Sequence, residues 1–350
     1  MGRGRSTRGD EPDSCARARR TGAGRSGAED RAGGSAIELV VPASLGGERV
    51  DRVLCLLTGM SRSQAAALVA AGSVEVAGRP VTTRSRPVLE GERLRARVAP
   101  LPAALPIPDA RVQIRVVHED ADLVVVDKPA GLVVHHGAGH TSGTLVEGLL
   151  ARYPELARPL SSGTWDPQRP GIVHRLDKQT SGLLVVARTP AAYASLSRQF
   201  RTHSATRQYR ALVVGTVVDS AGIIDAPVGR SVRIPTRMAV TVGGRPARTS
   251  YRVVARYSNP VHATLLDVRL ETGRTHQVRV HLAAIGHPVV GDDRYGAGRG
   301  RPRVVAQLLP PGRLFLHAWR LSLEHPAGGQ RTWESPLPGD LQQVLDAFEP

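Results

Sequence analysis

The sequence predicts an α+β protein with a small N-terminal domain and a larger C-terminal one, and three observations lead to this class. The 350 residues, 41% of them hydrophobic, are enough for about two domains. Helical patterns interrupt many short β-rich segments at irregular intervals, which disfavours a Rossmann or barrel arrangement. A stretch with three prolines, residues 101–110, cannot readily continue a helix or a sheet and predicts a linker over 99–112.

The charge of the chain indicates what kind of partner it binds. A formal net charge of +16 favours a polyanion such as nucleic acid, with an acidic membrane surface as the competing partner. Aromatic residues make up only 3% of the chain, too few for a platform on which single-stranded bases stack. We therefore expect recognition to depend on phosphate contacts and shape. Only two of the basic residues are lysines, Lys128 and Lys178, and both lie beside the residues singled out below.

The remaining composition bounds the compartment and excludes several chemistries. No run of about eighteen apolar residues and no secretory signal occurs, so the sequence predicts a cytoplasmic protein without a membrane span. The two cysteines, Cys15 and Cys55, predict neither a disulfide framework nor a zinc site. No long heptad pattern is visible, which predicts a monomer.

Residues 1–35 predict a disordered basic tail. They contain almost no large apolar side chains, and so cannot offset the entropy lost on ordering. Eight arginines against five acidic residues make the tail basic, and those acids argue against a transit peptide. The tail either adds nonspecific affinity for RNA or is a solvated extension without a role.

Residues 36–98 predict a compact helix-helix-strand unit. Val50, Val53, Leu54 and Leu57 recur at helical spacing, which predicts a first helix. Ser61 and Gln64 form a capping-box pattern for a second helix that ends at Gly72. The segment SVEVAGRPV alternates like a strand with a Gly-Arg turn, and VLEGERLRARV predicts another strand. In order and spacing this unit resembles the S4 RNA-binding domain. The resemblance implies RNA contacts from four surface arginines, namely Arg49, Arg52, Arg62 and Arg79.

Residues 113–350 predict an α+β domain rich in strands. Helical patterns occur near 144–152, 190–203 and 276–285. The predicted strands lie in seven segments: IRVVHE, LVVVDK, GLLVVAR, YRALVVGTV, TSYRVVARY, ATLLDVRLE and LFLHAWRLSLE.

The sequence contains no motif that would indicate a bound cofactor. No phosphate loop, HExxH, GxSxG or dinucleotide-binding GxGxxG motif is present, so we expect no cofactor. The segment HHGAGH, residues 135–140, offers histidines, but it lies in a glycine-rich loop without an acidic or cysteine partner at suitable spacing. We therefore expect no metal site there.

The segment RPGIVHRLDKQTSGLLVVAR, residues 169–188, places polar side chains directly before an apolar strand. In isolation, Asp177 in this segment would be read as a turn or capping residue that accepts hydrogen bonds from nearby amides. The string HRLDKQTSGLLVVAR, however, resembles without a gap the catalytic motif of the RluA-type family of RNA pseudouridine synthases. Two later segments match the same family in order, LETGRTHQVRVHLAAIGHPVVGDDRYG at 270–296 and LFLHAWRLSLEHP at 314–326.

The resemblance extends over about residues 40–345. The segment VVVDKPAGLVVHHG is similar to the family's opening strands, with His136 where a proline is common. In TRQYRAL the chain has Arg207 where the family often has a lysine. The implied fold is a mixed, largely antiparallel β-sheet with flanking helices, preceded by the S4-like domain.

The resemblance also implies roles for individual residues. Asp177 would be the catalytic carboxylate, which is ionised at neutral pH and attacks the sugar or base, or takes a sugar proton. Arg274 would pair with Asp177, and Tyr209 would stack on the target uracil. Arg175 would enter the RNA stack that the flipped uridine leaves. Further RNA-loop contacts are expected from three residues: His174, Lys178 and Thr180.

The predicted function is isomerisation of uridine to pseudouridine in structured RNA, most readily large-subunit ribosomal RNA, with transfer RNA left open. The first alternative is a noncatalytic RNA-binding or ribosome-assembly factor, which would not need Asp177, Tyr209 and Arg274 together. The second is a carboxylate glycosidase, which would need a second catalytic Asp or Glu that the sequence does not indicate. The sequence does not identify the uridines that are modified.

Overall fold

The computed structural model describes the chain with several gaps, in two units. The described residues are 35–58, 62–98, 105–136, 142–160, 165–231, 233–234, 237–296 and 309–349. The chain divides into compact units at Met1–Ala103 and Ala104–Pro350. Nearly all of the predicted tail lies outside the described residues. The described part of the predicted linker, residues 105–112, contains no helix or strand.

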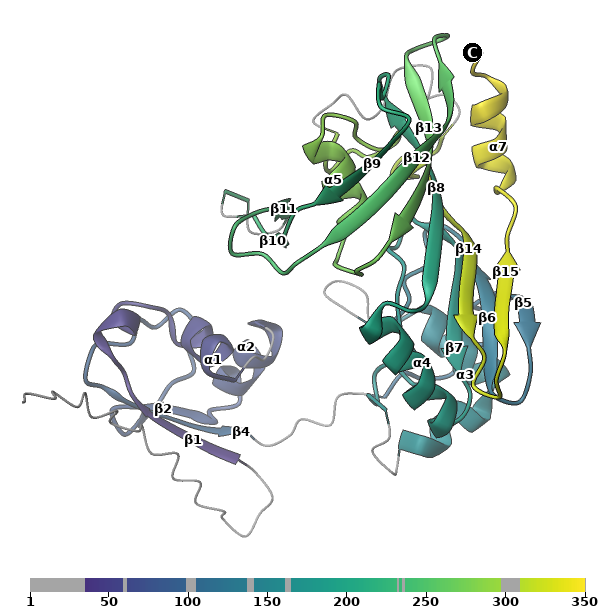
Figure 1. The fold of residues 1–350 in the computed structure, drawn as a ribbon. Coiled ribbons are helices and arrows are strands. Elements are labelled where there is room, and N and C mark those ends of the chain that lie inside the picture. Colours follow the sequence, from purple (N-terminus) through teal and green to yellow (C-terminus); the bar gives the residue numbers. More distant parts are fainter. Residues whose placement is uncertain are drawn as a thin grey trace, which may run out of the picture. The chain divides into compact units, whose positions relative to one another are not determined.

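The smaller unit packs two short helices on a four-stranded antiparallel sheet with the order β1-β4-β2-β3 (Figure 1). Its elements are β1 (Ser35–Val40), α1 (Val50–Thr58), α2 (Arg62–Ala70), β2 (Val74–Val76), β3 (Arg79–Pro80) and β4 (Arg93–Val98). Val50, Val53 and Leu54 of α1 are fully buried, as the helical spacing predicts. The two helices are confirmed, whereas β1 was not predicted.

The hairpin between β2 and β3 turns one residue earlier than the sequence suggested. Ala77 and Gly78 both have positive φ, 52° and 74°, and Val76 pairs with Arg79 across a two-residue loop. Positive φ at both loop positions suits the right-handed twist of a hairpin, and glycine adopts it readily. The expected Gly-Arg turn is therefore wrong, because Arg79 already belongs to β3. Ser61, the expected cap of α2, lies outside the described residues.

The larger unit is built on one mixed sheet of nine strands. Its strands are β5 (Arg115–Glu119), β6 (Leu123–Lys128), β7 (Ser181–Ala187), β8 (Thr206–Val214), β9 (Ala221–Asp225), β12 (Arg248–Tyr257), β13 (Ala263–Leu270), β14 (Leu316–Glu324) and β15 (Gln330–Glu334). The order is β5-β6-β7-β14-β8-β13-β12-β9, with β15 also paired to β14. Among the described strand pairs of this sheet, β7–β14 is the one parallel pair, so the expectation of a largely antiparallel mixed sheet is confirmed.

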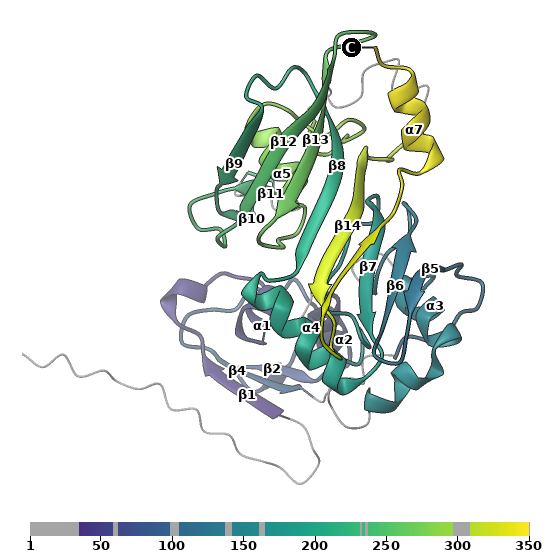
Figure 2. The same cartoon turned by 45° about the vertical axis from the view of Figure 1, so that its right-hand side comes forward.

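Two helices cover opposite faces of the β6–β7 part of this sheet (Figure 2). Val124 and Val126 belong to the same core as α3 (Leu145–Arg152). Leu123 and Val125, which alternate with them along β6, pack instead with α4 (Pro190–Thr202). Because successive side chains of a strand point to opposite faces, α3 and α4 lie on opposite sides.

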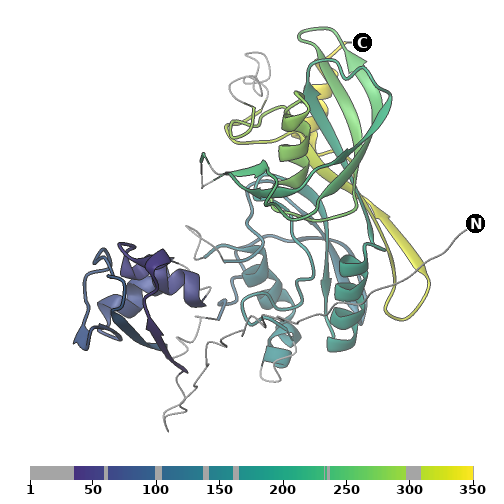
Figure 3. The same cartoon turned by 60° about the vertical axis from the view of Figure 1, so that its left-hand side comes forward.

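The other half of the sheet follows the same rule. Tyr209 of β8 shares a core with α5 (Gln277–Ala284), whereas the neighbouring Leu212 packs with α7 (Gly339–Asp346). Figure 3 shows α5 beside the strands of this half. Since α3 and α5 contribute to one core, the loops that lead into α5 and β7 meet on that face.

The three helical patterns predicted in this unit correspond to α3, α4 and α5, and all seven predicted strands are present. The elements that were not predicted are η2 (Pro154–Leu160), β9, β10 (Val228–Arg230), β11 (Met238–Val240), β15 and α7. Within the described residues, no helix combines the length and the apolar character needed to cross a membrane.

Candidate active site

The polar loop before β7 is fixed between two glycines that no other residue could replace without a clash. At Gly171, φ is +71° and a Cβ would lie 2.3 Å from the carbonyl oxygen of Ala187. At Gly182, φ is +114° and a Cβ would lie 2.3 Å from the carbonyl oxygen of Ala318 on β14. Both the space and the positive φ therefore require glycine, which fixes how the loop leaves and enters the sheet.

Lys128, at the end of β6, supports this loop from behind. Its side chain is fully buried, and its Nζ donates hydrogen bonds to the carbonyl oxygens of Pro129 at 2.7 Å, Leu132 at 3.0 Å and Lys178 at 3.2 Å. Burial lowers the pKa of Lys128 to about 7, and the nearby carboxylate of Asp177 opposes that shift. Three acceptors match the three N–H groups of an ammonium, which ties the residue after Asp177 to the core.

His174 anchors the other side of the loop. Its Nε2 accepts a hydrogen bond from the backbone N–H of Val185 at 3.0 Å, and its ring stacks on Phe200 with 4.4 Å between centroids. Burial, together with the charge of Arg207, lowers the pKa of His174 to about 3, so the ring is neutral at physiological pH. His174 thus contacts the strand and α4.

The carboxylate of Asp177 is paired with Arg279, not with Arg274 as the resemblance implied. The Nη1 of Arg279 donates to Oδ2 of Asp177 at 3.3 Å. Arg274 lies in the loop before α5, and its Nε donates to the carbonyl oxygen of Pro246 at 3.0 Å. The expected ion pair of Arg274 is therefore wrong, because Arg279 pairs with Asp177 and Arg274 instead donates to the carbonyl oxygen of Pro246.

Arg279 is itself held rigidly. Its Nε and Nη2 donate to the two oxygens of Asp292 at 2.7 and 3.0 Å, a bidentate pair in which the Asp292 side chain is fully enclosed. Its guanidinium also lies 4.9 Å from the ring centroid of Tyr295. Burial would lower the pKa of Arg279, but the pair with Asp292 raises it overall. The third nitrogen is left in a fixed position beside Asp177.

His276 is a further neighbour of Asp177, with 4.0 Å between its Nε2 and Oδ2 of the aspartate. Its other ring nitrogen is hydrogen-bonded to the hydroxyl of Tyr295 at 2.6 Å. His276 begins α5 with φ of 57°, a conformation that is uncommon for residues other than glycine. Burial lowers the pKa of His276 and the Asp177 carboxylate opposes this. The strained turn holds the ring over the carboxylate.

Asp177 opens into a cleft of about 560 Å³. Tyr209 lines this cleft with an exposed fraction of 4%, and burial raises the pKa of its phenol, so the hydroxyl keeps its proton at neutral pH. Among the described lining residues Asp177 is the one carboxylate. The cationic lining residues are seven arginines: Arg169, Arg175, Arg201, Arg207, Arg245, Arg274 and Arg279. A cleft with this charge suits a polyanion.

The other predicted loop residues lie in different environments. Arg175 is exposed at the cleft. Thr180 lines the cleft with an exposed fraction of 2%, and its hydroxyl has no hydrogen-bond partner among the described residues. Lys178 is exposed, and it is not one of the lining residues.

Of the arginines in the smaller unit that were predicted to bind RNA, two form ion pairs with acidic residues of the same unit. Arg49 makes a bidentate pair with Asp51, and Arg52 pairs with Glu48 at 3.1 Å. Arg79 is exposed. Arg62 begins α2, and its side chain is not among those that the structure describes.

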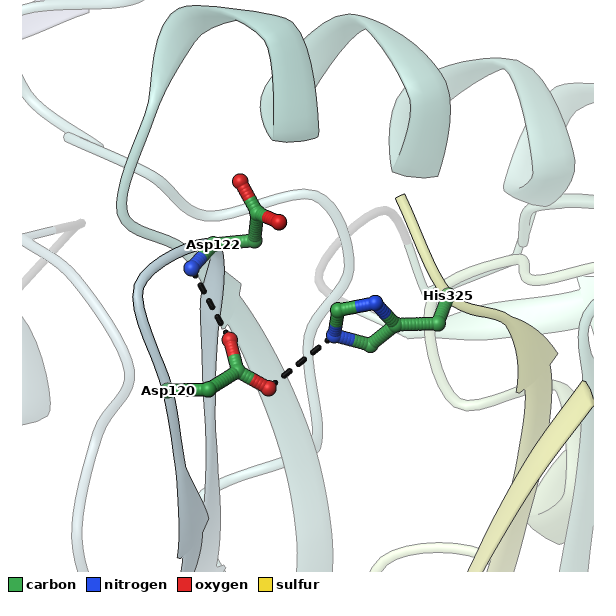
Figure 4. Close-up of side chains that lie close together, drawn as sticks. All are labelled: Asp120, Asp122 and His325. Atoms are coloured by element: carbon green, nitrogen blue, oxygen red, sulfur yellow. Dashed lines mark hydrogen bonds and ion pairs between the residues drawn. The ribbon is translucent and has the colours of Figure 1, made fainter. Parts of the chain in front are cut away.

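One group of side chains away from the cleft has the composition of a cation site. The ligand atoms of Asp120, Asp122 and His325 lie within 4.8 Å of one another (Figure 4). Asp120 already accepts hydrogen bonds from the backbone N–H groups of Asp122 and Leu123, at 2.8 and 2.9 Å, and from His325 at 3.0 Å. Those hydrogen bonds explain the cluster as a corner that joins the β5–β6 turn to the end of β14.

Sequence reasoning missed Arg279, Asp292 and His276. A signal for Arg279 was present, because it lies between Val278 and Val280 in an apolar helical segment, both of which are 4% exposed. An arginine inside such a segment is expected to be buried and paired. Nothing in the sequence identified Asp292 as its partner.

The comparisons with known proteins agree with this fold and cleft. Residues 122–284 match the family described as RNA pseudouridylate synthase, and residues 48–94 match the S4 domain. A protein of Nitrosomonas europaea named ribosomal large subunit pseudouridine synthase D is 42% identical over 89% of this chain and 88% of its own. A protein of the same name from Pseudomonas aeruginosa is 41% identical over 87% of this chain and 93% of its own.

The solved structure of human RNA pseudouridylate synthase domain containing 1 has a TM-score of 0.53 and 27% identity, and covers 69% of this chain and 91% of its own. An arginine-lined cleft with one carboxylate among its described lining residues, on this mixed sheet and in a chain that also matches the S4 domain, defines an RNA-modifying enzyme of the isomerase class. The chain belongs to the RNA pseudouridylate synthase family.

Proposed function

We propose that the protein converts specific uridines of large-subunit ribosomal RNA into pseudouridine. The observation that carries this proposal is the single carboxylate, Asp177, in an arginine-lined cleft of a chain whose full-length relatives are named for large-subunit ribosomal RNA. We further propose that it acts in the cytoplasm as a monomer.

The reaction needs one bond exchange and no added atoms. The N1–C1′ bond of uridine breaks, the uracil turns, and a C5–C1′ bond forms. C5 then loses its proton and N1 gains one. We propose that the carboxylate of Asp177 begins this exchange by adding to the ribose or the uracil, or by taking a ribose proton. Arg279 keeps that carboxylate oriented, and its own pair with Asp292 prevents it from turning away.

Three further residues would contact the target uridine or the RNA around it. Tyr209 would stack on the uracil and relay the proton at C5, since it is protonated and faces the cleft. Arg175 is exposed at the cleft and would fill the gap that the flipped uridine leaves. Arg274 would contact RNA at the rim of the cleft instead of the carboxylate.

The remaining predicted contacts would position the RNA. Lys178 is exposed on the catalytic loop and would contact phosphates, whereas His174 and Thr180 would shape that loop. In the S4 domain the same role would fall to four arginines, namely Arg49, Arg52, Arg62 and Arg79. Because these are phosphate contacts, binding is expected to weaken steeply as salt rises.

The test is to incubate a large-subunit ribosomal RNA transcript with the wild-type protein and with Asp177→Ala, and to map pseudouridine by chemical labelling and sequencing. We expect new pseudouridines with the wild type only. Transfer RNA, treated in parallel, decides between the two substrate classes. If both proteins bound RNA and neither modified it, the noncatalytic assembly factor would become the better explanation.

A further inference from the structure

Arg207 is a buried arginine that pairs with no acidic side chain among the described residues. It lies near the start of β8 with an exposed fraction of 8%. Its Nε is enclosed and has no hydrogen-bond partner among the described residues. Burying a guanidinium without a partner is costly, and burial accordingly lowers the pKa of Arg207. Such a group in a folded protein needs an explanation.

The groups around Arg207 leave its charge uncompensated. Its guanidinium carbon lies 5.4 Å from the ring centroid of Phe200. On another side, a Cβ at Gly273 would lie only 2.7 Å from its Nη1, so the missing side chain there makes room for the guanidinium. His174, which also stacks on Phe200, is neutral because burial and Arg207 itself lower its pKa to about 3.

The side chain of Arg207 faces the catalytic cleft. Arg207 and Tyr209 are two residues apart on β8, so they leave the strand on the same side, about 7 Å apart along it, and both line the cleft. The one carboxylate of that lining, Asp177, is paired with Arg279 instead. The guanidinium of Arg207 can therefore bind an anion that enters the cleft with the substrate.

We propose that Arg207 binds the RNA phosphate adjacent to the target uridine. A uracil stacked on Tyr209 brings its flanking phosphates into the same cleft, where Arg207 lies about 7 Å further along β8. The phosphate would accept hydrogen bonds from the guanidinium on the side that lines the cleft, while the guanidinium keeps its contact with Phe200. This inference rests on the proposed function, since it requires a uridine in the cleft.

The competing explanation is that Arg207 only attaches α4 to the sheet through Phe200. The two explanations differ in how binding responds to loss of one phosphate charge. We would use short RNAs that contain the mapped uridine, with a neutral methylphosphonate at its 5′ or its 3′ linkage, and measure affinity for wild type, Arg207→Gln and Arg252→Gln. Arg252 is an exposed arginine outside the cleft lining and serves as the charge-matched control.

We expect one of the two neutral linkages to weaken wild-type binding about ten- to a hundredfold, the size of a hydrogen bond between charged groups. The neutral linkage should weaken RNA binding by Arg252→Gln as much as it weakens binding by the wild type. Arg207→Gln should bind the RNA with this neutral linkage as tightly as it binds the unmodified RNA. An equal loss in wild type and Arg207→Gln, or no loss in the wild type at either linkage, would overturn the proposal. Turnover of the unmodified RNA by the wild type tests the proposed function separately.

Two further measurements keep the inference testable if no RNA is modified or if Arg207→Gln is unstable. Inorganic phosphate, at constant ionic strength, should raise the melting temperature of the wild type and of Arg252→Gln more than that of Arg207→Gln. Gly273→Ala should reduce the phosphate response while Arg207 is retained, because its Cβ displaces the guanidinium. Equal responses in all four proteins would contradict the assignment.

Discussion

Two aspartates of the larger unit stand just before neighbouring strands, and they are used in opposite ways. Asp120 precedes β6, and its oxygens accept hydrogen bonds from two backbone N–H groups and from His118 and His325. Asp177 precedes β7, but its turn is closed by its backbone carbonyl, which accepts from the N–H of Thr180 at 3.1 Å. The side chain of Asp177 contacts Arg279 and His276 through one oxygen.

The difference shows how a structural carboxylate can be distinguished from a reactive one when both lie in a loop just before a strand. The loop of Asp120 uses that carboxylate to satisfy its own amides, as short polar residues in turns commonly do. The loop of Asp177 is held by other groups, Lys128 and His174, so the carboxylate is not used to satisfy the amides of its own loop. Its second oxygen has no partner among the described residues and faces a cleft.

The largest expected effect comes from the pair Asp177→Asn and Asp120→Asn. Asp177→Asn should lower kcat by about ten-thousandfold or more, because an amide cannot replace a carboxylate as a nucleophile or base. Asp120→Asn should leave kcat near the wild-type value in the folded protein. Single-turnover kinetics on a mapped RNA measure both. Comparable losses of kcat in the two variants would remove the distinction between these carboxylates.

The next effect tests which arginine serves Asp177. Arg279→Gln should lower kcat by about a hundred- to a thousandfold, since it removes the charged donor that orients the carboxylate. Arg274→Gln should act mainly on KM, because its guanidinium contacts the carbonyl oxygen of Pro246 and lines the cleft. The same kinetic assay separates the two. A larger loss of kcat in Arg274→Gln would restore the role that the sequence suggested.

Arg274 and Arg279 also show how much of the site could be predicted from the sequence. Both lie in GRTHQVR, and the resemblance to the family identifies the segment without saying which side chain points at Asp177. That depends on where the chain enters α5, and His276, with φ of 57°, begins the helix so that Arg279 faces the cleft. Asp292 follows α5 in a separate turn, so its pairing with Arg279 is a tertiary contact that no local pattern encodes.

The fold was predicted best where the sequence shows a long apolar run or a clear helical spacing. β6 and β7 carry long apolar runs, and α3 and α4 have clear helical spacing, so each was found from the sequence. β10 and β11 have three residues each, too few to show a period. α7 lies near the end of the chain, and its burial depends on Leu341 and Val344 meeting a distant part of the sheet.

A smaller effect concerns the stability that Asp120 provides. Burial would raise the pKa of Asp120, but hydrogen bonds from Leu123, Asp122 and the two histidines lower it to about 2. A lowered pKa means that the folded state favours the ionised form, so the contribution is complete above the unfolded pKa of about 4 and is lost as the pH falls towards 2.

At pH 7, Asp120→Asn should therefore lower the unfolding free energy by about 1–2 kcal/mol. The difference between wild type and variant should shrink between pH 4 and pH 2, which urea unfolding at a series of pH values measures. A difference that stays constant over that range would mean that the charge of Asp120 is irrelevant to the corner.

The smallest effect is expected at Thr180, which lies in the same loop as Asp177. A variant of Thr180 tests whether a second polar group of that loop is left without a partner. The Thr180 hydroxyl is enclosed and has no partner among the described residues, although it lines the cleft. Thr180→Val removes an unsatisfied polar group, so it should raise the unfolding free energy by about 1 kcal/mol. If substrate uses the hydroxyl, the more stable variant should nonetheless have a higher KM. A stability loss would instead show that the hydroxyl is already satisfied in the free protein, and would place Thr180 with Asp120 among the residues that hold their own loop.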